Sequence, residues 1–220
     1  MFVGHYGPSF AIKSIERPLR LWVLFIAVQL LDVVWSLLVF IGVEKVRIVP
    51  GITASNPFDL YYMPYTHSLV AAIAWAIAAT IFSKVLLNVR NWSAGILVGA
   101  AVFSHWVLDF VVHRPDLPLY DDAAKVGLGL WNYPIIALSL EALLLFGGML
   151  MYLKRTRPLS SVGRFGPPIF GLIMLAIQGY IFFGPPPASP VAAAVTALVS
   201  YVFFAAVAHW LDRNREPTSS

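Results

Sequence analysis

Long stretches almost free of Asp, Glu, Lys and Arg dominate this sequence, and they constrain its fold more than any other feature. The longest covers 165–211 and is interrupted only by a Gly/Pro-rich segment at 184–190. A helix needs about 20 apolar residues to cross a membrane. Only 12% of the residues are charged, against about a quarter in a soluble domain. These values indicate an integral membrane protein and exclude a soluble enzyme, a coiled coil and a disordered chain.

The apolar stretches predict an all-α fold, a polytopic membrane helix bundle that forms one integral membrane domain over 1–220. We expect six transmembrane helices, over 19–43, 65–88, 91–113, 130–153, 166–184 and 189–211. Residues 3–16 are too short for a further span, and Pro18 separates them from the next one. They predict a short half-membrane helix packed beside the first span.

Lys and Arg are distributed unevenly between the predicted loops, which indicates the orientation. With the N-terminus inside, the outer set is Lys45, Arg47, Arg114 and Lys125. The inner set is Lys13, Arg17, Arg20, Lys84, Arg90, Lys154, Arg155, Arg157, Arg164, Arg213 and Arg215. Both termini are therefore predicted to be cytoplasmic. The net charge of +4 is explained by this topology, so we expect no nucleic-acid partner.

Ionisable side chains inside the predicted spans are the second strong signal. Each costs roughly 2.5–3.5 kcal/mol to insert, so each requires a partner or a function. They all fall in the first part of the chain: Asp32, His67, His105, Asp109, His113 and Glu141. Residues 1–153 are therefore predicted to carry the chemistry, and 165–211 are predicted to form a scaffold helix hairpin.

His105, Asp109 and His113 give the sharpest pattern. Positions i, i+4 and i+8 form one stripe along a helix. Imidazole and carboxylate are common ligands of zinc and similar divalent ions, and the chain has no Cys to supply a thiolate. The alternative is a His–Asp hydrogen bond that only satisfies two buried polar groups.

His67, Asp32 and Glu141 are expected near this stripe. Thr66 is the expected N-cap of the second span, which would place His67 in the first helical turn, where the helix dipole favours a neutral ring. At about 1.5 Å of rise per residue, Asp32 and Glu141 lie near the midplane and the histidines lie in the outer half. An interfacial histidine is the alternative for His67.

His5 would lie at the same depth as Asp32 if residues 3–16 and 19–43 form a hairpin that turns near Pro18. A frayed N-terminal histidine is the alternative. Other acidic residues are expected to be solvated charges in outer loops: Asp59, Asp116, Asp121 and Asp122. His209 and Asp212 lie at the predicted cytoplasmic end and are interpreted as structural.

These residues together predict a metal site. The expected ligands are His5, Asp32, His67, His105 and Asp109, and the catalytic candidates are Asp109, His113 and Glu141. Zinc is the expected ion, and manganese or iron would also fit. A divalent ion lowers the pKa of bound water and polarises a phosphoryl or acyl oxygen. The pattern therefore predicts a metal site with the lipid bilayer as its partner, at a depth that suits a phosphoester or lipid-like substrate.

Three short motifs also resemble those of a known family: Gly4-His5, Tyr65-Thr66-His67-Ser68 and Ser104-His105-Trp106-Val107-Leu108-Asp109. They look like the inner-membrane metal-dependent hydrolase-like proteins, which are also described as LexA-binding. The resemblance covers roughly residues 1–145. It implies a hydrolase located in the bacterial inner (plasma) membrane.

A more remote resemblance comes from the order of the His and Asp residues. It is similar to that of zinc-dependent phospholipase C and the fungal single-strand nucleases, which hold three zinc ions and hydrolyse phosphoesters. This likeness implies that Asp109 bridges two metals, one of them near His5. It further implies one metal held by Asp32, His67, His105 and Asp109, and a third held by His113 and Glu141.

The chain departs from that remote pattern at two points. Ala137 takes the place of a histidine four residues before Glu141, so a third metal would lose a ligand. The soluble enzymes also use their N-terminal amine, whereas four residues precede His5 here. One or two metals are therefore expected rather than three.

Two other functions would use the same buried groups. A cation- or proton-coupled transporter or channel would need a continuous polar path toward the cytoplasm. The sequence offers few polar residues for it: Gln29, Ser36, Thr80 and Gln178. A haem-binding electron carrier would use His67 and His105 as axial ligands. A purely structural membrane protein would leave the clustering as coincidence.

Overall fold

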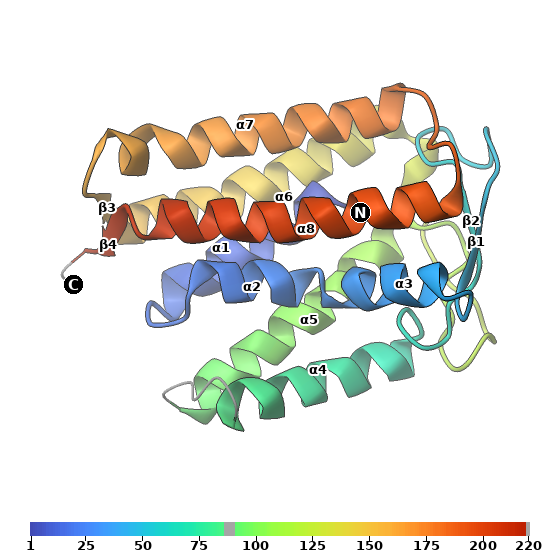
Figure 1. Cartoon of the computed structure of the whole chain (residues 1–220), viewed down its shortest axis with the longest axis horizontal. Coiled ribbons are helices and arrows are strands. Elements are labelled where there is room, and N and C mark those ends of the chain that lie inside the picture. Colours follow the sequence, from blue (N-terminus) through green and yellow to red (C-terminus); the bar gives the residue numbers. More distant parts are fainter. Residues whose placement is uncertain (86–90, 219–220) are drawn as a thin grey trace.

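The computed structural model of the chain describes residues 1–85 and 91–218. Helices run along the length of the molecule, and a small two-stranded antiparallel sheet lies at each end (Figure 1). The sheets pair β1 (Lys45–Ile48) with β2 (Phe58–Tyr62) and β3 (Thr156–Pro158) with β4 (Arg215–Pro217). The predicted helical class is confirmed, and the two sheets are a feature that the all-α prediction missed.

Within the described residues, four helices are long and apolar enough to cross a membrane. They are α5 (Trp92–Val112), α6 (Pro134–Arg155), α7 (Ser161–Phe183) and α8 (Pro190–Asp212). The helices α2 (Leu21–Val28) and α3 (Leu30–Phe40) make a fifth if the pair counts as one span. The six predicted spans are therefore not confirmed, although a membrane protein is what these helices indicate.

The helix α4 (Leu69–Val85) accounts for the difference, because it has only 17 residues. The apolar run from which the second span was predicted begins at residue 60, but its first part forms the end of β2 and a turn. A continuous apolar run does not by itself distinguish strand from helix. Residues 86–88 of that span, and Arg90 of the predicted inner set, lie outside the described residues.

The predicted span over 19–43 is bent by 53° between α2 and α3. Gln29 lies at the break, fully buried, and its Nε2 donates a hydrogen bond to the Phe2 carbonyl at 3.2 Å. The last carbonyls of a helix have no partner within that helix. The break therefore leaves the Val28 carbonyl, at the end of α2, available as a hydrogen-bond acceptor in the middle of the protein.

The predicted half-membrane helix is α1 (Tyr6–Ile15), preceded by the 3₁₀ helix η1 (Val3–His5). It packs on both α2 and α6 and buries most of its residues, including Tyr6 and Phe10, while Ile15 at its end is exposed. Gly7 and Gly148 allow the α1 and α6 backbones to touch, because a Cβ on either would meet backbone of the other helix. Small residues permit this close approach in membrane bundles.

The structure does not place the N-terminus at the predicted cytoplasmic end. Met1 is buried inside the bundle, where the N label appears in Figure 1, whereas the C-terminal end lies beside β3 and β4. The direction of α1 explains this position. Its C-terminal end, at Ile15, is the end that reaches the charged loops, and its N-terminal end points into the protein.

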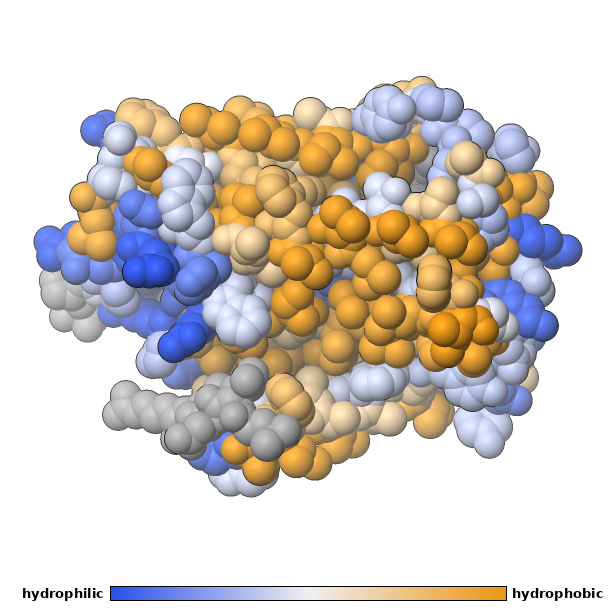
Figure 2. Space-filling view, in the orientation of Figure 1, coloured by the Kyte–Doolittle hydropathy of each residue, from blue (hydrophilic) through white to orange (hydrophobic). Residues whose placement is uncertain are grey.

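The surface agrees with a membrane environment. Figure 2 shows apolar side chains over the middle of the helices and hydrophilic residues gathered at both ends. Large apolar side chains remain exposed on the helices themselves, for example Leu172, Val202 and Phe203, at 60%, 64% and 59%. Such a surface would be unfavourable in water and is favourable against lipid chains.

A cluster of polar side chains joins the helices at the end that carries β3 and β4. Lys13 Nζ pairs with Asp212 Oδ2 at 3.0 Å and donates to the carbonyls of Arg17 and Leu19. Tyr152 donates its hydroxyl hydrogen to Asp212 Oδ1 at 2.9 Å. We call Lys13, Tyr152 and Asp212 the inner cluster. Asp212 thus has the kind of structural contacts that were expected of it.

Candidate metal centre

Four separate elements bring the five predicted metal ligands together. His5 lies on η1, Asp32 on α3, His67 in the turn before α4, and His105 and Asp109 on α5. Their ligand atoms form two groups of three within 4.8 Å, His5–His105–Asp109 and Asp32–His67–His105. We call these five residues the His/Asp cluster. The site lies between two apolar clusters of the core, so it forms a polar layer inside the bundle.

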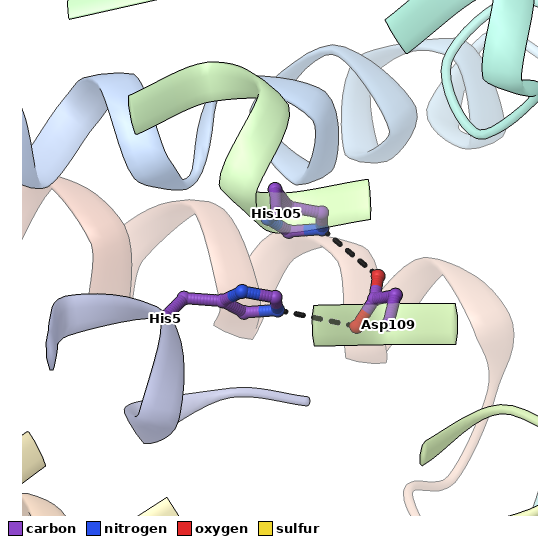
Figure 3. A group of neighbouring side chains, drawn as sticks. All are labelled: His5, His105 and Asp109. Atoms are coloured by element: carbon purple, nitrogen blue, oxygen red, sulfur yellow. Dashed lines mark hydrogen bonds and ion pairs between the residues drawn. The ribbon is translucent and has the colours of Figure 1, made fainter. Parts of the chain in front are cut away.

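Asp109 lies at the centre of the cluster, and its two carboxylate oxygens face different histidines. Oδ1 lies 3.2 Å from His5 Nε2, and Oδ2 lies 3.0 Å from His105 Nε2 (Figure 3). Oδ2 also lies 3.7 Å from His67 Nε2 and 3.6 Å from His113 Nε2. A carboxylate in this position can serve two sites at once, one through each oxygen.

Asp32 lies at the edge of the cluster and is its most accessible member. Its Oδ1 is 3.3 Å from His67 Nε2 and 3.6 Å from His105 Nε2. Its side chain is 18% exposed, while those of the other four are between 0% and 4% exposed. Tyr201 of α8 donates its hydroxyl hydrogen to Asp32 Oδ2 at 2.8 Å. The hairpin predicted to be scaffold therefore contributes a contact to the site.

The bend between α2 and α3 determines the proton position on His105. Its Nδ1 lies 2.7 Å from the Val28 carbonyl, which can only accept a hydrogen bond. Nδ1 must therefore carry the hydrogen, and Nε2 of the neutral ring has a lone pair. That lone pair points toward Asp109 and Asp32, and Nε2 is buried without a hydrogen-bond partner among the described residues.

His67 is oriented in the same way by a chain of hydrogen bonds. The Thr66 hydroxyl donates to Glu44 Oε2 at 2.6 Å, so it must accept from His67 Nδ1, which lies 2.7 Å away. Glu44 is held in turn by the backbone N–H groups of Tyr65 and Thr66. Burial raises the pKa of Glu44, whereas His67 and the hydrogen bonds oppose this shift.

Thr66 is therefore not the helix N-cap that was predicted, because its hydroxyl is committed to Glu44. Ser68 takes that position, and its Oγ accepts from the Ala71 N–H at 3.1 Å. α4 accordingly begins at Leu69, and His67 lies before the helix instead of in its first turn. Trp106 Nε1 fixes the His67 backbone by donating to its carbonyl at 2.9 Å.

His113 completes the set of oriented rings. Its Nδ1 donates to Asp116 Oδ1 at 2.9 Å, and Arg114 pairs with both Asp116 and Asp59. Asp59 and Asp116 are 7% and 3% exposed, so the prediction that they are solvated charges is wrong. Their burial follows from the pairing with Arg114, which compensates both carboxylates. Asp121, in contrast, is exposed.

These hydrogen bonds leave three imidazole lone pairs facing carboxylate oxygens. In the neutral tautomers of His67, His105 and His113, each Nε2 is an acceptor, and each faces Asp109, itself an acceptor. Two acceptors repel at 3.0–3.7 Å unless a cation or a proton lies between them. The donor set of imidazole nitrogens and carboxylate oxygens is the one that divalent zinc binds. The residues thus fit a metal ion.

Two other groups lie near the cluster, the α-amino group of Met1 and the carboxylate of Glu141 on α6. The α-amino group of Met1 lies 2.6 Å from Asp109 Oδ1, because residues 1–4 fold back toward α5. Glu141 accepts hydrogen bonds from the Phe2 and Gly4 N–H groups through Oε2, and its buried Oε1 has no partner among the described residues. Glu141 therefore holds the segment that carries His5, and its catalytic role stays a prediction.

His5 is the least constrained ring of the cluster. It stacks on His105 with ring centroids 3.8 Å apart and an interplanar angle of 5°. Its Nδ1 is buried and has no hydrogen-bond partner in the described chain. His5 is 0% exposed, which contradicts the alternative of a frayed terminal histidine.

Several residues of the site were missed by the sequence analysis. Asp116 could have been found, because His113 and Asp116 are three residues apart. Glu44, Thr66 and Tyr201 could not, since the contacts of Glu44 and Tyr201 depend on how distant segments meet. Val28 contributes a backbone atom, which no side-chain pattern reveals.

No protein-family model, no curated protein and no solved structure matches this chain. The resemblance to the inner-membrane hydrolase-like proteins therefore stays a prediction that rests on the three short motifs.

Proposed function

We propose that this protein is a membrane-embedded, metal-dependent hydrolase that acts on a phosphoester or lipid-like substrate in a bacterial inner membrane. One observation carries the proposal. The Nε2 atoms of His67 and His105 each face both Asp32 and Asp109 across 3.0–3.7 Å, in an interior where neutral rings cannot bond to both carboxylates. A divalent ion would satisfy all four groups, and zinc fits this donor set best, with manganese or iron as other choices.

The proposed ligands form two sites, one on each carboxylate oxygen of Asp109. Asp32, His67, His105 and Asp109 Oδ2 would hold one ion, and Asp109 Oδ1 with His5 would form part of a second site. Glu44 and the Val28 carbonyl would keep His67 and His105 in the tautomers that ligation requires. Partners of this kind orient metal ligands in many metalloproteins. When bound, the ion would lower the pKa of water and polarise the scissile group.

His113 is the residue best suited to move a proton. Its Nδ1–H is held by Asp116, so its Nε2 lone pair faces the cluster. In phosphoester hydrolysis the water oxygen forms a bond to phosphorus, the bond to the leaving oxygen breaks, and a proton leaves the water. His113 Nε2 would accept that proton and later return it to the leaving oxygen. Asp116 would stabilise the imidazolium.

A lipid-like substrate is supported by the location of the site. Asp32, the most accessible ligand, lies on a helix whose surface carries exposed Leu37 and Phe40. The other four members of the cluster have side chains with no more than 4% exposure. A substrate that reaches the cluster would therefore pass Asp32 and would have to be compatible with the apolar belt.

The alternative functions receive less support. The described residues between the cluster and the inner cluster are mainly apolar, with Phe10, Leu24 and Phe25 fully buried there. A transporter would need a polar path through this region. For a haem carrier, the His67 and His105 rings are only 5.5 Å apart, and the carboxylates of Asp32 and Asp109 face the nitrogens that a porphyrin iron would need.

Metal analysis of the detergent-purified full-length chain tests the proposal. We expect stoichiometric zinc, manganese or iron in the wild type and only trace metal in the Asp109→Ala/His105→Ala double variant. Asp121→Asn, which removes an exposed carboxylate outside the site, is the matched control and should retain the metal. Release of the headgroup, phosphorylated or free, or of fatty acid from phospholipid vesicles is then measured for all three proteins.

Each outcome is informative. Trace metal in the wild type would exclude the metal site, and stoichiometric metal in the double variant would exclude these ligands. Metal binding without metal-dependent hydrolysis of any phospholipid would leave the site in place and remove the hydrolase assignment. A chain that carries ⁶⁵Zn²⁺ across the membrane of sealed vesicles would instead support transport.

A further inference from the structure

A second feature lies far from the His/Asp cluster and is not used by the proposed function. A cavity of about 430 Å³ opens between the C-terminal ends of α1 and α6, beside β3. Its lining residues are Ser14, Ile15, Arg17, Met151, Lys154 and Arg155. This is an end of the bundle where hydrophilic residues gather (Figure 2).

Three of the lining residues are cations, and none of them has an acidic partner within the described residues. Lys154 and Arg155 are exposed and form no ion pair within residues 1–85 and 91–218. Arg17 uses one N–H to bond the Thr218 carbonyl at 2.8 Å, which fixes the guanidinium at the rim and leaves its other donors available. Positive charge therefore converges on this cavity.

The other wall of the cavity is apolar. Ile15 and Met151 are 67% and 45% exposed, and both lie one turn or less from the cations in the same helix ends. An occupant must therefore combine a negative group with an apolar part. A charge bias explains how many cations lie at this end of a membrane protein. It does not explain why three of them surround a hollow next to exposed aliphatic side chains.

We propose that this cavity binds the phosphate group of an anionic phospholipid, with the acyl chains along Ile15 and Met151. Basic pockets between helices at the membrane surface bind lipid headgroups in this way. The Arg17 and Arg155 guanidinium groups can each present two parallel N–H donors to phosphate oxygens, and Lys154 supplies a further positive charge. Inorganic phosphate shares the headgroup chemistry but lacks the apolar part.

Native mass spectrometry of the full-length chain in detergent tests this site by titration with phosphatidylglycerol, phosphatidylcholine or inorganic phosphate. The test variant is Lys154→Gln/Arg155→Gln. The control is Arg164→Gln/Arg213→Gln, which removes two exposed cations from the same end but outside the cavity. All four positions are exposed, so both variants should fold, and their metal content should equal that of the wild type.

We expect the wild type to prefer phosphatidylglycerol to phosphatidylcholine. The test variant should lose about 30-fold in affinity for phosphatidylglycerol, and the control less than about threefold. An equal loss in the two variants would show a general charge effect and overturn the proposal. Inorganic phosphate that binds as tightly as phosphatidylglycerol would also overturn it, because the acyl chains would then contribute nothing.

Discussion

The inner cluster and the His/Asp cluster balance their charges in opposite ways. In the inner cluster, Lys13 is an ammonium group that faces a carboxylate, Asp212, and also donates to two carbonyls. In the His/Asp cluster, Asp32 and Asp109 face imidazole nitrogens, and neither contacts a Lys or Arg within the described chain. The Met1 amino group is the one full positive charge that contacts Asp109 there.

This difference in charge balance distinguishes a structural cluster from a candidate functional one. A buried ion pair that satisfies its own charges holds helices together and needs no ligand. A buried group of acceptors that face one another is unfavourable unless a cation is supplied. We therefore expect the two clusters to respond differently to substitution and to metal removal.

The largest expected difference concerns Asp109 and Asp212. Asp109→Asn should reduce bound metal from stoichiometric to less than about a tenth, because both oxygens face ligand nitrogens and a neutral amide binds divalent ions poorly. Asp212→Asn should retain the metal but destabilise the protein by about 3 kcal/mol, because Lys13 loses its buried partner. Metal analysis and thermal unfolding in the same detergent measure both effects. If the Asp212 variant loses metal as completely as the Asp109 variant, the two clusters are not distinct.

Metal removal should destabilise the wild type and leave the Asp109→Asn variant unchanged. A ligand that binds only the folded state stabilises it by about 4 kcal/mol when its free concentration is 1,000 times Kd. Addition of a chelator should therefore lower the melting temperature of the wild type by several degrees, and added zinc should restore it. A chelator that lowers the melting temperature of the Asp109 variant as much would indicate that the metal binds elsewhere.

A smaller effect is expected for Glu44, which is linked to His67 by hydrogen bonds through Thr66. Glu44→Gln should weaken zinc binding by about 10- to 100-fold, as is typical for residues that orient a metal ligand. Thr66→Val should have a similar effect, since it removes the hydroxyl between the two. Competition with a fluorescent zinc indicator measures the affinity. Asp121→Asn, which removes an exposed carboxylate outside the site, is the control, and an equal loss in that variant would indicate an effect of surface charge instead of ring orientation.

The smallest effect is expected for Tyr201, whose hydroxyl donates one hydrogen bond to Asp32 Oδ2. Tyr201→Phe should weaken zinc binding about three- to tenfold, because Asp32 keeps its Oδ1 for the ion and loses one charge-assisted hydrogen bond. The same zinc competition measures the change. Tyr180→Phe serves as the control, since Tyr180 is 65% exposed on the neighbouring helix α7. An unchanged affinity for zinc in the Tyr201 variant would indicate that α7 and α8 act only as a scaffold, as predicted.

Much of the candidate site was predictable because charge inside an apolar run is a strong and local signal. Asp32, His105 and Asp109 are conspicuous in spans that otherwise contain almost no ionisable residue. The spacing of His105, Asp109 and His113 also follows directly from helical periodicity. Contacts such as Tyr201 with Asp32 were not predictable, because those residues are 169 positions apart.

The helix boundaries also depend in part on contacts that the sequence does not reveal. Hydropathy located every helix from α2 to α8, but it could not distinguish the end of β2 from the start of α4, or detect the bend at Gln29. Gln29, at that bend, contacts the Phe2 carbonyl, which is 27 positions away. The bend determines the tautomer of His105 through Val28, so a small error in the fold would become an error in the chemistry of the site.

The sequence by itself determined that the chain is a helical membrane protein and that the ionisable residues within its apolar runs lie in the interior. Both conclusions follow from the free energy of moving each side chain from water into lipid, which depends on residue type and local run length. Only the tertiary structure decided that these residues converge, which oxygen of Asp109 faces which ring, and which nitrogens have free lone pairs. Those properties depend on directional hydrogen bonds between distant segments, and composition and periodicity carry no information about them.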